Sequence, residues 1–213
     1  MRADDLTSLR DLMQEKCIQK AGESEFVLAS GLTTKYYYDG KKVTLKPRPA
    51  KVIGQMLLEM VREAGAEAVG GMTIGADPIA QSVALASVED DGGEVPAFIV
   101  RAAKKDHGTR EQTSAAFADD GGPLLRKGRK VAVVDDVVTT GGSVRGAIEA
   151  VEAMGCDVVL VIALVERHES VRALQDDGYN FRRLFYTDEK GDLFIDERLP
   201  QSATELSRTG VLR

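Results

Sequence analysis

Two uninterrupted apolar runs, Val131–Val134 and Val158–Val165, restrict the fold more than any other feature of the sequence. A strand with one face in water alternates apolar and polar residues, whereas a strand covered on both faces is apolar throughout. A segment with helical periodicity separates the two runs, and this order is typical of a parallel sheet with helices on both faces. We therefore predict an α/β fold.

The same alternation of strands and helices extends along most of the chain. Residues 25–45 alternate strand formers with turn residues and predict a hairpin. Strands are predicted at 68–72, 97–102, 130–134, 157–167 and 181–187, and helices at 6–17, 50–63, 77–87, 143–155 and 168–178. Ligands of open parallel sheets bind beyond the carboxyl ends of the strands, where three unusual loops would meet: 70–78, 101–122 and 135–143.

Length, charge and cysteine content exclude several classes of protein. The 213 residues suit one domain, 1–213, and the net charge of −6 argues against nucleic acid as a partner. No apolar run approaches the roughly 20 residues of a membrane span, and the charged N-terminus lacks a secretory signal, so we expect a cytoplasmic protein. Cys17 and Cys156 form no CxxC motif, which favours reduced core thiols over a disulfide or a metal site.

The loop after the 130–134 strand combines Asp135 and Asp136 with a turn of hydroxyl and glycine residues, 139–143. Free N–H groups and the dipole at the start of the following helix would bind a phosphate monoester. Two carboxylates beside a phosphate repel it unless a sugar hydroxyl or a divalent cation lies between them, so a ribose phosphate suits the loop. The alternative is an ordinary strand-to-helix turn with Thr140 or Ser143 as the N-cap.

The stretch VVDDVVTTGGS resembles the phosphoribosyl pyrophosphate (PRPP) signature of type I phosphoribosyltransferases. The resemblance implies a central, mostly parallel sheet flanked by helices, forming a core over 46–187. It also implies a small N-terminal hood, formed by about 1–45 with a C-terminal segment. Asp135 and Asp136 would hold the ribose hydroxyls of PRPP. The residues implied to bind the 5′-phosphate are Thr139, Thr140, Gly141, Gly142 and Ser143.

Three further segments are similar to orotate phosphoribosyltransferases: FIVRAAKKDHGT at 98–109, the aromatic segment 26–45, and LVERHES at 164–170. These enzymes convert orotate and PRPP into orotidine 5′-monophosphate and pyrophosphate in UMP biosynthesis. The resemblance implies that Arg167 binds the orotate carboxylate. The other residues assigned to orotate are Tyr37, Tyr38 and Thr139.

Basic residues of the 98–109 segment would meet the pyrophosphate leaving group. They are Arg101, Lys104, Lys105 and His107, of which Lys105 and His107 join Asp135 and Asp136 as the implied catalytic set. Pyrophosphate needs cations as its charge develops, and we expect Mg²⁺ as the cofactor, carried by PRPP and with no protein ligand assigned. The resemblance also implies a homodimer whose subunits share this loop.

Some positions depart from the family pattern. Ala29, Ala102 and Gly75-Ala76 stand where many of these enzymes carry cations, and the candidate replacements are Lys41, Lys42 and Lys104. Two alternatives stay open at this point. One is a phosphoribosyltransferase for another base, such as a purine, and the other is a non-catalytic regulator that senses PRPP.

Overall fold

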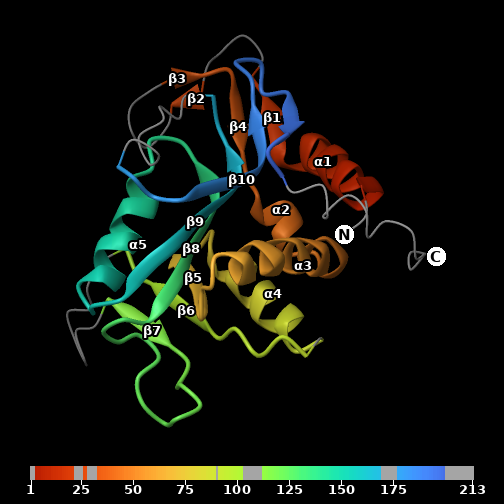
Figure 1. The fold of residues 1–213 in the computed structure, drawn as a ribbon. Helices are drawn as coiled ribbons and strands as arrows, with labels where there is room; N and C mark the ends of the chain where they lie inside the picture. Colours follow the sequence, from red (N-terminus) through yellow and green to blue (C-terminus); the bar gives the residue numbers. More distant parts are fainter. Residues whose placement is uncertain are drawn as a thin grey trace.

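A seven-stranded sheet forms the centre of the structure (Figure 1), a computed structural model that describes residues 3–21, 26–27, 33–89, 91–102, 112–168 and 177–199. The strand order is β11-β10-β9-β8-β5-β6-β7. The five inner strands are parallel, and β7 and β11 are antiparallel edges. The strands are β5 (Ala68–Met72), β6 (Ala97–Val100), β7 (Thr113–Ala115), β8 (Lys130–Val138), β9 (Asp157–Glu166), β10 (Phe181–Thr187) and β11 (Leu193–Ile195). The prediction of an α/β fold with a mostly parallel sheet is confirmed.

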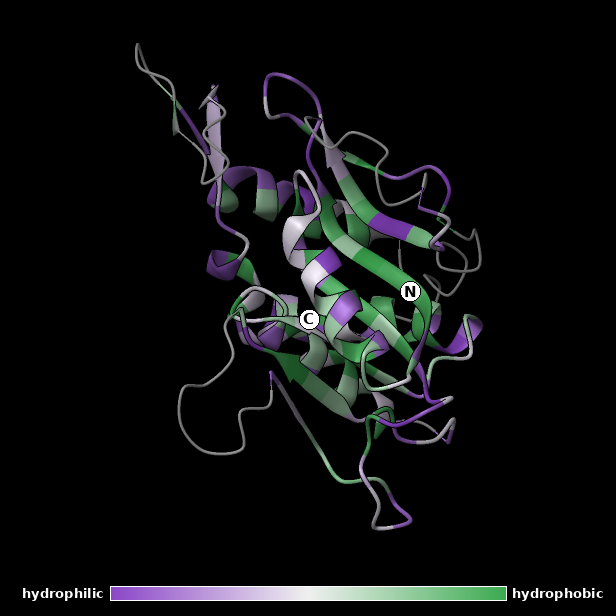
Figure 2. Ribbon diagram, turned by 90° about the vertical axis from the view of Figure 1, so that its left-hand side faces the viewer, coloured by the Kyte–Doolittle hydropathy of each residue, from purple (hydrophilic) through white to green (hydrophobic). Residues whose placement is uncertain are grey.

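Helices cover both faces of this sheet, with α5 (Gly142–Glu152) on one side and α3 (Pro47–Glu63) and α4 (Asp77–Ser87) on the other (Figure 1). Successive residues of β8 therefore enter different cores: Val131 and Val133 pack with α5, whereas Ala132 and Val134 pack with α3 and α4. The burial of both faces explains the uninterrupted apolar runs, which colour the inner strands green in Figure 2. No helix in the described part of the chain is long and apolar enough to cross a membrane.

The N-terminal segment lies over one end of the sheet. It contains α1 (Ala3–Cys17), β1 (Ile18–Lys20), β2 (Phe26–Val27), β3 (Thr33–Thr34), β4 (Tyr36–Tyr38) and α2 (Lys41–Thr44). The predicted hairpin is only partly confirmed, because β2 pairs with β3 but β4 pairs with β1, and residues 41–44 are helical. Gln14 of α1 ties this segment to the C-terminal strands by accepting from Leu193 N and donating to Gly191 O. The division into hood and core stays a prediction.

Other boundaries differ from the predictions for local reasons. Helix α3 begins at Pro47 and not after Pro49, because both prolines occupy the first turn, where the missing N–H groups need no partner. The edge strands β7 and β11 were not predicted, since three-residue antiparallel edges carry little periodicity. Most of the predicted helix 168–178 and the C-terminal tail lie outside the described residues.

Helices α3 and α4 approach closely because Gly54 has no side chain. A Cβ atom at Gly54 would lie under 3.0 Å from the backbone carbonyl group of Ser82. We expect Gly54→Ala to lower the free energy of unfolding by about 1–3 kcal/mol, because α3 must move away from α4.

Gly146→Ala in α5 is the matched control, measured in the same urea unfolding series. Its Cβ would meet only the flexible end of Met72, at 3.1 Å, so improved helix propensity should leave stability unchanged or raise it by up to about 1 kcal/mol. Equal effects of the two substitutions would contradict the packing argument.

Candidate active site

Asp135 and Asp136 lie within β8, three and two residues before its end at Val138. Asp135 is opposite Ala163 of β9, and the ladder continues to Val138, so the prediction that the strand stops before the aspartates is wrong. The apolar pair Val137 and Val138 extends the sheet beyond the acids. Each aspartate is only 7% exposed, and the Asp136 N–H donates to Asp135 Oδ1 at 3.0 Å. The two carboxyl groups are thereby fixed by the backbone of a central strand.

Burial raises the pKa of both carboxyl groups. For Asp135 the pKa rises to about 8, chiefly because burial removes water from the charged form and next because the charge of Asp136 is near. Burial also raises the pKa of Asp136, and the positive charge of Lys41 opposes that rise. Near neutral pH the pair therefore retains a proton when no ligand is bound. A cation or a hydroxyl-bearing ligand at this position would stabilise the ionised form.

The turn after β8 leads directly into α5. Gly141 is the N-cap with φ of 78°, a left-handed conformation that favours glycine, and no side chain caps the helix. Thr140 and Ser143 are therefore not N-caps, which removes the simple alternative to a ligand site. The uncapped N–H groups of the first turn and the positive end of the helix dipole suit an anion at this point.

The β5–α4 loop reaches the same aspartates. A Cβ atom at Gly75 would lie 2.8 Å from Asp136 Cγ and 3.3 Å from Asp135 Oδ1, so the absence of a side chain lets the loop backbone approach the carboxyl groups. Two of the three predicted loops thus meet.

In the third predicted loop, Arg101 donates to Ser114 Oγ at 2.6 Å. Ala102 follows β6, but Ala29, Lys104, Lys105 and His107 lie outside the described residues.

Strand β4 and helix α2 close the other side of the site. Tyr38 is 5% exposed, whereas Tyr37 is 44% exposed and its ring lies 5.9 Å from that of Phe26. A Cβ atom at Gly40 would lie 2.9 Å from Tyr38 Oη and 3.0 Å from Asp136 Oδ2, so Tyr38 faces the aspartates. Its buried hydroxyl has no hydrogen-bond partner among the described residues, and burial raises its pKa well above the usual value.

Lys41 is the described cation next to the aspartates. Its Nζ lies 2.8 Å from Asp39 Oδ1, and this contact raises the pKa of Lys41. The sequence suggested Lys41 only as a replacement cation, and nothing in the spacing showed that it faces Asp136. Lys42, the next candidate, lines a different groove.

Arg167 follows the last residue of β9 and is 3% exposed. Its guanidinium group donates to Thr34 Oγ1 at 2.7 Å and stacks on Tyr36, with 4.2 Å between Cζ and the ring centroid. Sequence reasoning did not identify Thr34 or Tyr36 as functional residues. Both residues are buried in the structure, but the run TTKYYY at 33–38 has no apolar alternation that would indicate it.

One cavity of about 490 Å³ brings most of the predicted residues together. It is lined by Tyr37, Tyr38, Lys41, Arg167 and residues 135–143. Carboxylates, an uncapped helix start and a guanidinium group thus border one space at the carboxyl ends of the strands. Among the described residues, no group of three or more His, Cys, Asp or Glu side chains is placed to hold a metal ion. Two adjacent carboxylates nevertheless suit Mg²⁺ that also binds substrate phosphates.

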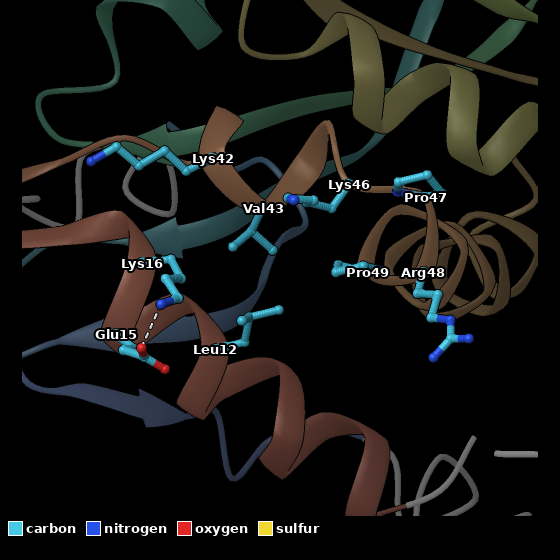
Figure 3. Close-up of a pocket in the computed structure, with 9 residues that line it drawn as sticks. All are labelled: Leu12, Glu15, Lys16, Lys42, Val43, Lys46, Pro47, Arg48 and Pro49. Atoms are coloured by element: carbon cyan, nitrogen blue, oxygen red, sulfur yellow. Dashed lines mark hydrogen bonds and ion pairs between the residues drawn. The ribbon is translucent and has the colours of Figure 1, made fainter. Parts of the chain in front are cut away.

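A larger groove, of about 870 Å³, lies between α1, α2 and the start of α3 (Figure 3). Leu12, Val43 and Pro49 line its interior, with Lys46 and Arg48 at its margin. Its one carboxylate, Glu15, pairs with Lys16. This groove contains none of the strand-end loops and lacks the combination of groups found around Asp135.

Comparison with known proteins identifies the family. The sequence profile of the phosphoribosyl transferase domain matches residues 52–186. Orotate phosphoribosyltransferase of Aquifex aeolicus is 37% identical over 83% of this chain and 92% of its own, and that of Nostoc sp. is 39% identical over 86% and 85%. A crystal structure of the Mycobacterium tuberculosis orotate phosphoribosyltransferase in complex with PRPP has a TM-score of 0.64 and 28% identity, covering 84% of this chain and 94% of that one. The chain therefore belongs to the phosphoribosyltransferase family, among the orotate phosphoribosyltransferases.

Proposed function

We propose that this protein transfers the 5-phosphoribosyl group of PRPP to N1 of orotate, giving orotidine 5′-monophosphate and pyrophosphate in UMP biosynthesis. The observation that carries the proposal is the shared cavity, in which Asp135 and Asp136 lie between the uncapped start of α5 and Arg167. The start of α5 would bind the phosphate of PRPP, the aspartates its ribose, and Arg167 the carboxylate of orotate. The similarity to orotate phosphoribosyltransferases over most of the chain supports the same assignment.

The 5′-phosphate of PRPP would bind at the turn from Thr139 to Ser143. The first-turn N–H groups of α5 have no partner within the helix, and no side chain caps them. The turn also supplies three hydroxyl donors, those of Thr139, Thr140 and Ser143. Binding there fixes one end of the ribose, so that C1′ extends over the aspartates.

Asp135 and Asp136 would accept hydrogen bonds from the ribose hydroxyls. The reaction breaks the bond between C1′ and the pyrophosphate oxygen and forms a bond between C1′ and N1 of orotate, with inversion at C1′. Positive charge develops on the ribose ring as the leaving group departs. Two carboxylates in a site with little water stabilise that charge more strongly than they would in water.

The pyrophosphate leaving group requires positive charge. Lys41 lies on the cavity wall, and the predicted set Arg101, Lys104, Lys105 and His107 would add to it. Gly75 keeps the β5–α4 backbone open to the phosphates. Asp135 and Asp136 are the residues suited to Mg²⁺ brought by PRPP, and the ion would neutralise the charge that develops on pyrophosphate.

Orotate would bind between Arg167 and β4. A guanidinium group pairs with a carboxylate through two parallel hydrogen bonds, and orotate differs from uracil and purines by its carboxylate. Tyr37 and Tyr38 line the same cavity, and Thr139 would lie between the base and the ribose phosphate. This placement favours orotate over the other bases.

We further propose a homodimer and a cytoplasmic location. Leu85 of α4 and Val88, which follows that helix, are more than 60% exposed and line a groove of about 500 Å³ beside β6 and β7, a surface that suits a second copy of the chain. The free, buried thiols of Cys17 and Cys156 suit a reducing compartment, and cell fractionation tests that location.

The dimer is tested by sedimentation equilibrium. The expected mass is twice the 23.0 kDa of one chain, and Leu85→Asp should shift it towards the monomer because the charge would be buried in an apolar contact. A native protein that is monomeric at micromolar concentrations would exclude the dimer.

The proposed reaction is tested by mixing the purified protein with PRPP, MgCl₂ and orotate and following the loss of orotate absorbance. Turnover is expected with orotate, not with uracil, adenine or hypoxanthine, and EDTA should abolish it. Turnover only with a purine would move the protein to another branch of the family. The absence of turnover with every base would overturn the enzymatic assignment.

Substitution of Asp135 tests the buried carboxyl pair through stability and activity together. Its pKa rises from 3.8 in the unfolded chain to about 8, so between these values the folded state holds a proton that the unfolded state has lost. The stability of the native protein therefore decreases as pH rises through that window. The Tm of Asp135→Asn should exceed that of the native protein by a margin that grows from pH 5 to pH 8, while turnover falls at least about a hundredfold.

Asp120→Asn is the matched control. Asp120 is exposed and pairs with Arg126, which holds its pKa at about 2, so it stays ionised throughout this pH range. Its substitution should leave turnover unchanged and give a Tm difference that does not vary between pH 5 and pH 8. A Tm margin for Asp135→Asn that shrinks with rising pH would contradict the assignment.

A further inference from the structure

Arg167 is held in place by β3 and β4 before any substrate arrives. Its Nη2 donates to Thr34 Oγ1 at 2.7 Å and to the carbonyl oxygen of Tyr36 at 3.4 Å, and its Nε donates to Tyr36 Oη at 3.3 Å. The guanidinium plane stacks on the Tyr36 ring. Two nitrogen atoms and one face of the group thus contact β3 and β4, which holds it against these strands.

The Tyr36 hydroxyl is the centre of a buried hydrogen-bond network. Thr187 Oγ1 lies 2.6 Å from Tyr36 Oη, and His168 Nδ1 lies 3.1 Å from it. The His168 backbone N–H donates to Thr187 Oγ1 at 3.2 Å. One consistent assignment has Thr187 donating to Tyr36 Oη, which accepts also from Arg167 and donates to His168 Nδ1.

The β10–β11 turn packs against the Tyr36 ring, and helix α1 is bonded to that turn. Tyr36 is fully buried, and a Cβ atom at Gly191, in the β10–β11 turn, would lie 2.7 Å from Tyr36 Cγ. Gln14 of α1 bonds to that turn on both sides of Asp192. The hydroxyl position therefore depends on β4, β10 and α1 together, and Tyr36 has no freedom to follow a moving Arg167.

We propose that Tyr36 is a positioning residue for base recognition, which sets the orientation of Arg167 towards the orotate carboxylate through its hydroxyl and its ring. This inference rests on the proposed contact between Arg167 and orotate. A free arginine side chain loses conformational entropy when it binds a ligand, whereas a prearranged guanidinium group does not. Tyr36 touches no substrate in this scheme, and its effect is confined to the base.

Tyr36→Phe tests the inference, since it removes only the hydroxyl and keeps the stacked ring. Steady-state kinetics should show a rise in KM for orotate of about three- to tenfold, with KM for PRPP and kcat within about twofold of the native values. Tyr186→Phe is the matched control, because Arg183 Cζ lies 4.3 Å from the Tyr186 ring in a comparable pair outside the cavity. It should change neither KM.

A double-mutant cycle separates positioning from general loss of structure. Arg167→Ala alone should raise KM for orotate by about thirtyfold or more. Tyr36→Phe added to Arg167→Ala should raise it no further, because the residue to be positioned is absent. The Tm of each variant is measured by thermal unfolding. If Tyr36→Phe does not fold, Thr187→Val repeats the test, and Thr187→Ser, which keeps the hydroxyl, should restore the native KM.

The outcomes distinguish this inference from the proposed function. If Arg167→Ala leaves KM for orotate unchanged, the proposed orotate contact fails. If Arg167→Ala raises KM but Tyr36→Phe does not, or if Tyr36→Phe raises both KM values alike, only the positioning role is overturned. Additive effects in the double variant would also overturn it.

Discussion

The paired carboxyl groups of Asp135 and Asp136 are the constraint around which the site is organised. Burial of two acids side by side in a central strand opposes folding unless protons, cations or ligand hydroxyls compensate. The rest of the fold offsets this cost, because β8 pairs with parallel neighbours, β5 and β9, on both sides and is covered by helices on both faces. The strand continues to Val138, so the acids occupy a fixed backbone and not a loose loop.

The surroundings of the pair follow from that constraint. Gly40 and Gly75 each lie against one carboxyl oxygen of Asp136, so the absence of their side chains lets the β4–α2 and β5–α4 backbones approach it. Lys41 provides the nearby positive charge, and the start of α5 provides a second positive potential. A ligand that is itself a phosphate ester with hydroxyls, such as PRPP, complements each of these features.

The sequence was sufficient for the fold class and for bringing the two aspartates and the Thr139–Ser143 turn to one cavity, whereas the ribose phosphate that they indicate stays a prediction. Apolar runs such as Val158–Val165 predicted buried parallel strands, and the aspartates followed by the Thr139–Ser143 turn predicted a ribose phosphate. Local periodicity did not place β7 and β11, because short edge strands depend on partners far along the chain. Nor did it find Tyr36 or the orientation of Lys41, which result from the contacts of Tyr36 with Thr187 and Gly191 and from the charge interaction of Lys41 with Asp136. These contacts join residues more than 90 positions apart, and such tertiary contacts leave no regular spacing in a single sequence.

The Tyr36 network joins β3 and β4 to Arg167 and Thr187, and we expect it to divide the site into regions of different local stability. The aspartates lie in the middle of the central sheet, which we expect to open only when the whole domain unfolds, whereas Thr34 and Tyr36 lie on short strands outside that sheet. Partial opening at the periphery would disorder the groups around Arg167 and leave the phosphate turn intact. The affinity for the base and the affinity for the sugar phosphate therefore report on separate cooperative units of one fold.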